Sequence, residues 1–158
     1  MNEHNIEIDL HQCGIYKNLE SFLVYFDQNN DVDKCLIYSS MFNIPSLCEY
    51  FISHGANVNE KAKDRRTALH NAAINNSKET AELLLSHGAN VNEKDIVGLT
   101  SLHEAARYNY KEIAEVLLSH GANVTEKDEY GKTALHIAAR YNRKETAEIL
   151  LSHGANLF

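Results

Sequence analysis

Nine histidines and three cysteines are the residues of this chain best suited to chemistry. Histidine side chains bind metals and act as general bases, and cysteine thiolates act as nucleophiles or zinc ligands. Seven of the histidines form two evenly spaced series, which are His70, His103 and His136, and His54, His87, His120 and His153. The step within each series is 33 residues. A period of this size indicates a repeat architecture, so the histidine spacing has a structural explanation before a chemical one.

A shared metal site does not fit this spacing. Equivalent residues of stacked repeats lie roughly 8–10 Å apart, whereas the ligands of one zinc ion lie about 2 Å from it. His70, His103 and His136 therefore cannot hold one ion. The three cysteines are odd in number and show no Cys-x-x-Cys spacing, which favours buried, reduced thiols over a zinc site or disulfides. We predict neither a metal nor another cofactor.

Catalytic motifs are missing from the sequence. It contains no glycine-rich phosphate loop, no Gly-x-Ser-x-Gly elbow and no His-Glu-x-x-His. Acid pairs near lysine, such as Glu79 and Glu82, are typical of a solvated helix face. An enzyme would need a pocket with convergent titratable groups, which nothing in the sequence indicates. We predict that the protein is not an enzyme.

Composition excludes several other classes of function. The 158 residues, 44% of them hydrophobic, suffice for one domain with a core. A net charge of −7 argues against nucleic acid as a partner, and residues 1–52 hold most of it, with two lysines against eight acidic residues. The sequence has no apolar run of about 18 residues and does not begin like a signal peptide. We therefore expect a soluble, cytoplasmic protein with no membrane partner.

Two sequence blocks recur in the same register. Ser-His-Gly-Ala-Asn occupies residues 53–57, 86–90, 119–123 and 152–156. Thr-x-Leu-His begins at Thr67, Thr100 and Thr133, and each copy is followed by one residue and then Ala-Ala. Threonine is a good N-cap, and the apolar spacing within each block predicts one buried helical face. Each first helix should end at an asparagine in the left-handed conformation, which is Asn76, Asn109 or Asn142.

A second helix follows each of these asparagines, for example over residues 77–86, and ends just before a glycine. Histidines 54, 87, 120 and 153 lie at these helix ends, where they can support the last carbonyl groups. Between the glycine and the next threonine lie eleven turn-forming residues, which we call a finger. Asp128 and Gly131 suit a tight turn at the tip of one finger.

With these motifs, residues 53–158 resemble the ankyrin-repeat family, whose unit is a hairpin-like turn followed by two antiparallel helices. The resemblance implies an all-α solenoid of helix pairs joined by short hairpin-like turns. It implies structural roles for Thr67, His70, Thr100, His103, Thr133 and His136, and for Gly55, Gly88, Gly121 and Gly154. In the family the motif histidine bonds the preceding threonine and a nearby backbone carbonyl.

Two features depart from the family pattern. The proline of the family motif is Ala68, Ser101 or Ala134 here, which should leave each helix in place but slightly weaker. In the first finger, Ala62 and Arg65 stand where the turn aspartate and glycine are expected, so we predict irregular geometry there.

Residues 1–52 lack Thr-x-Leu-His but keep apolar stripes typical of helix pairs. This segment is similar to the helical segment that precedes ankyrin repeats in large families of parasitic protist proteins. We interpret it as two degenerate helix pairs that cap the N-terminal end of the stack, because a terminal repeat has a neighbour on one side only. The chain would then form one continuous solenoid of five helix pairs, with ankyrin repeats over residues 53–158.

The repeats differ from one another mainly at the fingers and at the ends of the first helices. These positions hold Lys61, Lys63, Arg66, Lys94, Ile96, Val97, Leu99, Arg107, Tyr108, Lys127, Tyr130, Lys132, Arg140 and Tyr141. The resemblance implies that they line a concave face that binds protein partners, and arginine and tyrosine are enriched in binding hot spots. We predict a non-catalytic scaffold for an acidic or aromatic-containing epitope. The alternative is that the tyrosines pack on the next repeat and the lysines only solvate the surface.

The last repeat keeps a full apolar pattern, although capping repeats usually carry polar residues there. We expect this end to be covered by a second copy, head-to-tail or in a symmetric dimer, or by a continuation of the chain, and self-association would use Ile149, Leu150, Leu151, Leu157 and Phe158. A self-associating structural module, a homo-oligomer, is therefore the alternative function.

Overall fold

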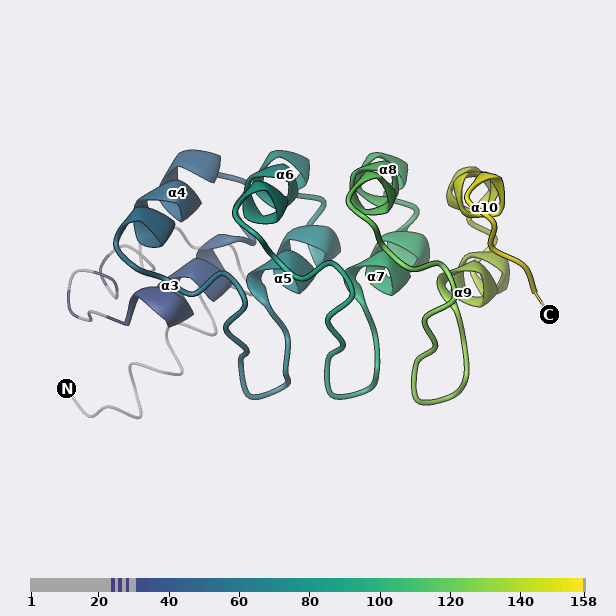
Figure 1. Cartoon of the computed structure of the whole chain (residues 1–158), viewed down its shortest axis with the longest axis horizontal. Coiled ribbons are helices and arrows are strands. Elements are labelled where there is room, and N and C mark those ends of the chain that lie inside the picture. Colours follow the sequence, from purple (N-terminus) through teal and green to yellow (C-terminus); the bar gives the residue numbers. More distant parts are fainter. Residues whose placement is uncertain (1–23, 25, 27, 29–30, 158) are drawn as a thin grey trace.

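The computed structural model describes residues 24, 26, 28 and 31–157. This part of the chain contains eight α-helices and no strand. The helices are α3 (Val32–Ser39), α4 (Pro45–Ser53), α5 (Ala68–Ile74), α6 (Lys78–Ser86), α7 (Ser101–Tyr108), α8 (Lys111–Ser119), α9 (Ala134–Arg140) and α10 (Lys144–Ser152). Consecutive helices form pairs, and the pairs stack in a row (Figure 1). The prediction of an all-α solenoid is confirmed.

Backbone conformation explains where the first helix of each pair ends. Asn76, Asn109 and Asn142 have φ values of 54°, 59° and 56°. Asparagine tolerates this left-handed conformation better than most residues, and it turns the chain toward the second helix. Asn43 does the same after α3, with φ of 52°, although no Thr-x-Leu-His precedes it. The predicted left-handed asparagines are confirmed.

The second helix of each pair ends at a histidine followed by a glycine. Gly88, after α6, has φ of 88°, which is strained for any residue with a Cβ. At the end of α8, His120 Nδ1 donates to the carbonyl of Val116 at 2.9 Å. His54 and His153 make the same bond four residues back. His54, His120 and His153 thus bond the last helical carbonyls, whereas the side chain of His87 makes no such bond.

The stack has an inner and an outer row of helices. Helices α3, α5, α7 and α9 contact one another in sequence, and so do α4, α6, α8 and α10 (Figure 1). The core lies between the rows and continues from layer to layer, with fully buried leucines at positions 36, 69, 84, 102 and 117. Each layer therefore buries apolar surface against its neighbours. Three fingers, at residues 56–66, 89–99 and 122–132, project from the inner row (Figure 1).

Some expectations concern residues outside the described part of the chain. The first of the five expected helix pairs falls largely there, and so does Phe158. Helices α3 and α4 form the layer next to α5 and α6. Cys35 and Cys48 are buried free thiols, and burial raises the pKa of Cys35 to about 12. None of the described helices combines the length and the apolar character that crossing a membrane requires.

Candidate functional site

Each Thr-x-Leu-His motif forms one hydrogen-bonded unit at the start of an inner helix. Thr100 Oγ1 accepts a bond from the backbone N–H of His103 at 3.4 Å. His103 Nδ1 accepts one from the backbone N–H of Thr100 at 3.1 Å. Because Nδ1 is an acceptor, the proton of the neutral ring lies on Nε2. The motifs that open α5 and α9 have the same capping box.

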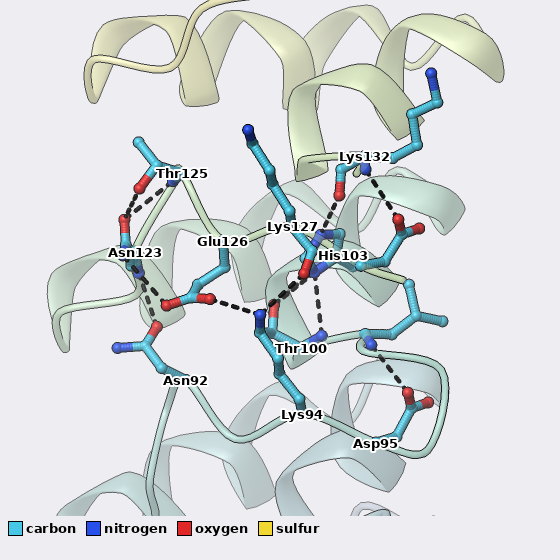
Figure 2. Close-up of polar contacts among 12 residues, drawn as sticks. Asn92, Lys94, Asp95, Thr100, His103, Asn123, Thr125, Glu126, Lys127 and Lys132 are labelled. Atoms are coloured by element: carbon cyan, nitrogen blue, oxygen red, sulfur yellow. Dashed lines mark hydrogen bonds and ion pairs between the residues drawn. The ribbon is translucent and has the colours of Figure 1, made fainter. Parts of the chain in front are cut away.

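The other ring nitrogen joins each layer to the following finger. His103 Nε2 donates to the carbonyl oxygen of Lys132 at 2.9 Å (Figure 2). His70 makes the same bond to Leu99 at 2.9 Å. Both nitrogens of these rings are therefore engaged, and no lone pair is left for a metal. Desolvation by burial lowers the pKa of both histidines, which keeps them neutral.

The second and third fingers share one turn geometry. In the second finger, Asp95 N–H donates to the carbonyl of Leu99 at 2.9 Å, and Gly98 N–H donates to that of Asp95 at 3.0 Å. The Asp95 carboxylate accepts two further bonds, from the N–H groups of Val97 and Leu99. Asp128 accepts the equivalent bonds in the third finger. One aspartate thus closes each turn.

The prediction of irregular geometry in the first finger is wrong. Ala62 N–H donates to the carbonyl of Arg66, and Arg65 N–H donates to that of Ala62, both at 2.9 Å. Arg65 adopts φ of 64°, although glycine occupies this position in the other fingers. The Asp64 carboxylate accepts a bond from Arg66 N–H at 3.0 Å and replaces part of the missing aspartate network. Hydrogen bonds within the finger therefore hold the turn despite its unfavourable sequence.

Bonds between neighbouring fingers tie the three into one row. Ile96 N–H donates to the carbonyl of Asp64 at 2.9 Å, and Glu129 N–H donates to that of Val97 at 3.1 Å. Lys94 Nζ lies 2.9 Å from both the Lys127 carbonyl and a Glu126 carboxylate oxygen (Figure 2). Lys61 pairs with Glu93 at 2.6 Å. Lys61 and Lys94, which we predicted to contact a partner, thus pair with acids of the next finger.

Most of the predicted partner-binding residues are exposed. The exposed residues are Lys61, Lys63, Ile96, Val97, Arg107, Tyr108, Lys127, Tyr130, Lys132, Arg140 and Tyr141, and the half-buried ones are Arg66, Lys94 and Leu99. Ile96 and Tyr130 protrude most, with exposed fractions of 65% and 77%. Leu99, which we predicted to contact a partner, is half-buried rather than exposed. Leu99 lies at the finger base, where its N–H bonds Asp95 and its carbonyl bonds His70.

Four exposed residues at the ends of α7 and α9 form what we call the arginine–tyrosine ladder, namely Arg107, Tyr108, Arg140 and Tyr141. The guanidinium carbon of Arg107 lies 5.6 Å from the ring centroid of Tyr108 and 5.8 Å from that of Tyr141 in the next layer. That of Arg140 lies 5.7 Å from Tyr141. Tyr108 in turn stacks on Tyr110. These cation–π contacts hold the arginines in place across two layers.

Sequence reasoning missed Glu104, a carboxyl group on α7 that is only 2% exposed. Its Oε1 has no hydrogen-bond partner among the described residues, and the nearest cationic atom is Arg66 Nη2 at 3.8 Å. Desolvation raises the pKa of Glu104, and the charges of Arg66 and Arg107 oppose this. The equivalent residues of α5 and α9 are Asn71 and Ile137. The sequence did hold a signal for this residue, because the same repeat position carries an amide in one repeat, an acid in the next and an aliphatic side chain in the third.

Arg66, which we predicted to contact a partner, is instead surrounded by acidic side chains of the protein itself. Besides Glu104, its guanidinium approaches Asp95 at 3.7 Å and Asp64 at 3.8 Å. It links the first finger to the second finger and to α7. Glu104 lies close enough to Arg66 and Arg107 for both to act on its pKa, which connects the finger bases electrostatically to the ladder.

The motifs, the stacked helix pairs and the fingers agree with the comparison to known families. A family model for ankyrin repeats (3 copies) matches residues 10–95 and 92–158. The chain belongs to the ankyrin-repeat family. The match begins at residue 10, so it includes much of the segment that we interpreted as degenerate. Comparison with curated proteins finds no match.

The last described layer of the ankyrin stack is open on one side. Leu118 is 9% exposed beneath the following layer, whereas its equivalent in α10, Leu151, is 54% exposed. Ala139 is also exposed, although its equivalent Ala106 is fully buried. The placement of Leu150 on this open face is wrong, because Leu150 points into the core and is fully buried. Ile149 is half-buried, and Leu157 is exposed.

Proposed function

We propose that this ankyrin-repeat protein is a non-catalytic scaffold that binds a protein partner at its fingers and inner helices. Ankyrin repeats generally mediate protein–protein interactions. The observation that carries the proposal is the arginine–tyrosine ladder, which places four side chains of types enriched in hot spots on one exposed surface. A net charge of −7 favours a protein over nucleic acid as the partner.

The rigidity of this surface supports the proposal. Ordering a flexible side chain on binding costs roughly 0.5–1.5 kcal/mol, and a side chain already held in place avoids part of that cost. Stacking on tyrosine rings holds both ladder arginines, and Arg143 Nε, which donates to the carbonyl of Arg107 at 2.9 Å, fixes the end of α7. The bonds between fingers stabilise the adjoining surface in the same way.

Affinity capture with matched variants tests the proposal. The ladder variant carries alanine at positions 107, 108, 140 and 141, and the control carries Lys78→Ala and Lys111→Ala. Both remove two positive charges, but the control residues lie on α6 and α8 of the outer row. Proteins captured by the wild type should remain with the control and be lost with the ladder variant. Identical captures by the wild type and the ladder variant, with unchanged circular dichroism, would refute the proposal.

Self-association is a second candidate, favoured by the open layer at α9 and α10. Leu151, Leu157 and Ala139 leave apolar surface there that the inner layers bury. On α10, Lys144 and Glu148 lie seven and three residues before Leu151 on the same side, so an antiparallel copy of α10 would place opposite charges together. A second copy related by twofold symmetry therefore suits this face.

Light scattering across a concentration series tests self-association. The wild type should approach the mass of a dimer, and Leu151→Glu should stay a monomer. Val97→Glu, at an exposed finger position, is the control and should still dimerise. A wild-type chain that remains monomeric at the highest concentration contradicts this candidate.

A further inference from the structure

We infer that the arginine–tyrosine ladder binds an extended acidic segment, with one carboxylate on Arg107 and another on Arg140, three residues apart. This inference rests on the proposed function and specifies the chemistry of the partner. It is carried by the placement of two exposed guanidinium groups in successive layers.

Among the residues that the structure describes, neither ladder arginine has an acidic ion-pair partner, although the charge of Arg107 acts on the pKa of Glu104. Within the described part of the chain, acidic side chains pair with Lys61, Arg66, Lys78 and Lys94, but none lies within ion-pair distance of Arg107 or Arg140. The acid closest to the ladder in sequence, Glu104, is buried and points toward Arg66. An incoming carboxylate therefore meets guanidinium groups that have no competing ion pair.

The N–H groups of the two ladder arginines are available to bind a carboxylate. The side chains of Arg107 and Arg140 donate no hydrogen bond to any described residue, so their N–H groups remain available to a ligand. A planar guanidinium binds a carboxylate through two parallel hydrogen bonds, which a lysine cannot reproduce. Arg107 lies within 6 Å of the rings of both Tyr108 and Tyr141, at 5.6 and 5.8 Å, so it is held at the junction of two layers.

The distance between layers sets the spacing of the acids. Packed helices lie about 8–10 Å apart, so equivalent residues of α7 and α9 repeat at that distance. A polyproline II segment advances about 3.1 Å per residue and has three residues per turn, so every third side chain returns to one side after about 9 Å. Acidic residues at positions i and i+3 of such a segment match the two arginines.

The ladder also has defined ends, which limits the motif to two acids. In α5 the equivalent positions hold Ile74 and Asn75, so the preceding layer offers no third arginine. Lys127 and Lys132 are exposed on the finger that leads into the N-terminus of α9, at the other end of the helix from Arg140. We therefore expect the segment to follow the last two complete layers.

Fluorescence anisotropy with three labelled, proline-rich peptides tests this inference. The first peptide carries Glu-Pro-Pro-Glu, the second carries Gln-Pro-Pro-Gln, and the third carries two adjacent glutamates. At low ionic strength, the first should bind the wild type at least about tenfold more tightly than the other two. Binding should weaken as salt is added, because both arginines are exposed.

Variants identify the site. Arg107→Ala with Arg140→Ala should lower the affinity for the first peptide at least about tenfold, and lysine at both positions should restore only part of it. Lys78→Ala with Lys111→Ala, which removes the same charge from the outer row, should leave affinity unchanged within about twofold. Equal binding of the glutamate and glutamine peptides, or equal losses in the two alanine pairs, would overturn the inference.

The outcome is separable from that of the proposed function. If captured partners still depend on the ladder but no acidic peptide binds, the acidic segment is wrong and the binding surface stands. If neither the capture of partners nor the binding of peptides changes in the ladder variants, both proposals fail.

Discussion

Replacing His103 by alanine should destabilise the protein far more than the same change at His136. Both residues cap an inner helix, but His103 is buried and joins two layers, whereas His136 is half-buried in the last one. Loss of the His103 ring leaves Thr100 N–H without a partner and removes one of the two bonds that the Lys132 carbonyl accepts, since Asp128 N–H still donates to it. An unsatisfied buried group costs about 1–3 kcal/mol and a lost hydrogen bond about 0.5–1.5 kcal/mol, so the total loss should be about 2–4 kcal/mol.

The change at His136 should cost about 1–2 kcal/mol, because water reaches this site and Nε2 makes a longer bond, 3.2 Å to the carbonyl of Leu157. Urea unfolding followed by circular dichroism gives both free energies of unfolding, provided that the denaturant dependence is unchanged. His87→Ala, at an exposed helix end, is the control and should change stability by less than about 0.5 kcal/mol. Equal losses at positions 103 and 136 would refute the claim that this histidine joins layers.

Three further predictions follow from the same contacts. Glu104→Gln should stabilise the protein at pH 7, because burial raises the pKa of Glu104 and its ionised form destabilises the folded state; the gain should vanish in unfolding measurements at about pH 4.5 and below. Folding stability should fall as pH drops below about 6.5, since burial lowers the pKa of His70 and His103, and His103→Gln should flatten this dependence in acid titrations. Gly98→Ala should cost more in urea unfolding than Gly131→Ala, which should lose about 1–2 kcal/mol from its left-handed backbone alone. A Cβ at Gly98 would lie 2.9 Å from Glu129 N, whereas one at Gly131 meets nothing within 4 Å; equal losses would contradict this explanation.

Much of the fold was predictable because its determinants are local and recur. Thr100 and His103 form their capping box within one turn of chain, and Asn109 needs only its own backbone preference to end α7. Repetition of these residues at one period predicts the stack as well. The same reasoning failed for the turn at Arg65. Bonds within the finger and to the next layer hold this residue in a conformation that its side chain disfavours.

The candidate site was less predictable because it depends on contacts between repeats. Sequence comparison within the chain identified Arg107 and Tyr141 as variable, but not their contact across two layers. The comparison did not predict that Leu150 is buried and Leu151 exposed. The residues equivalent to both are buried in α6 and α8, and their exposure differs only in the open layer. Glu104 escaped notice because its burial depends on the finger that packs beside it.

Site-specific photo-crosslinking tests the central claim, that the inner row and its fingers bind a protein partner. A photo-crosslinking amino acid would replace Tyr108 on α7 or, in the control, Glu115, which is exposed on α8 of the outer row. The account predicts a discrete covalent adduct with a partner protein from position 108 and none from position 115. Adducts of equal yield from both positions, or from position 115 alone, would contradict it.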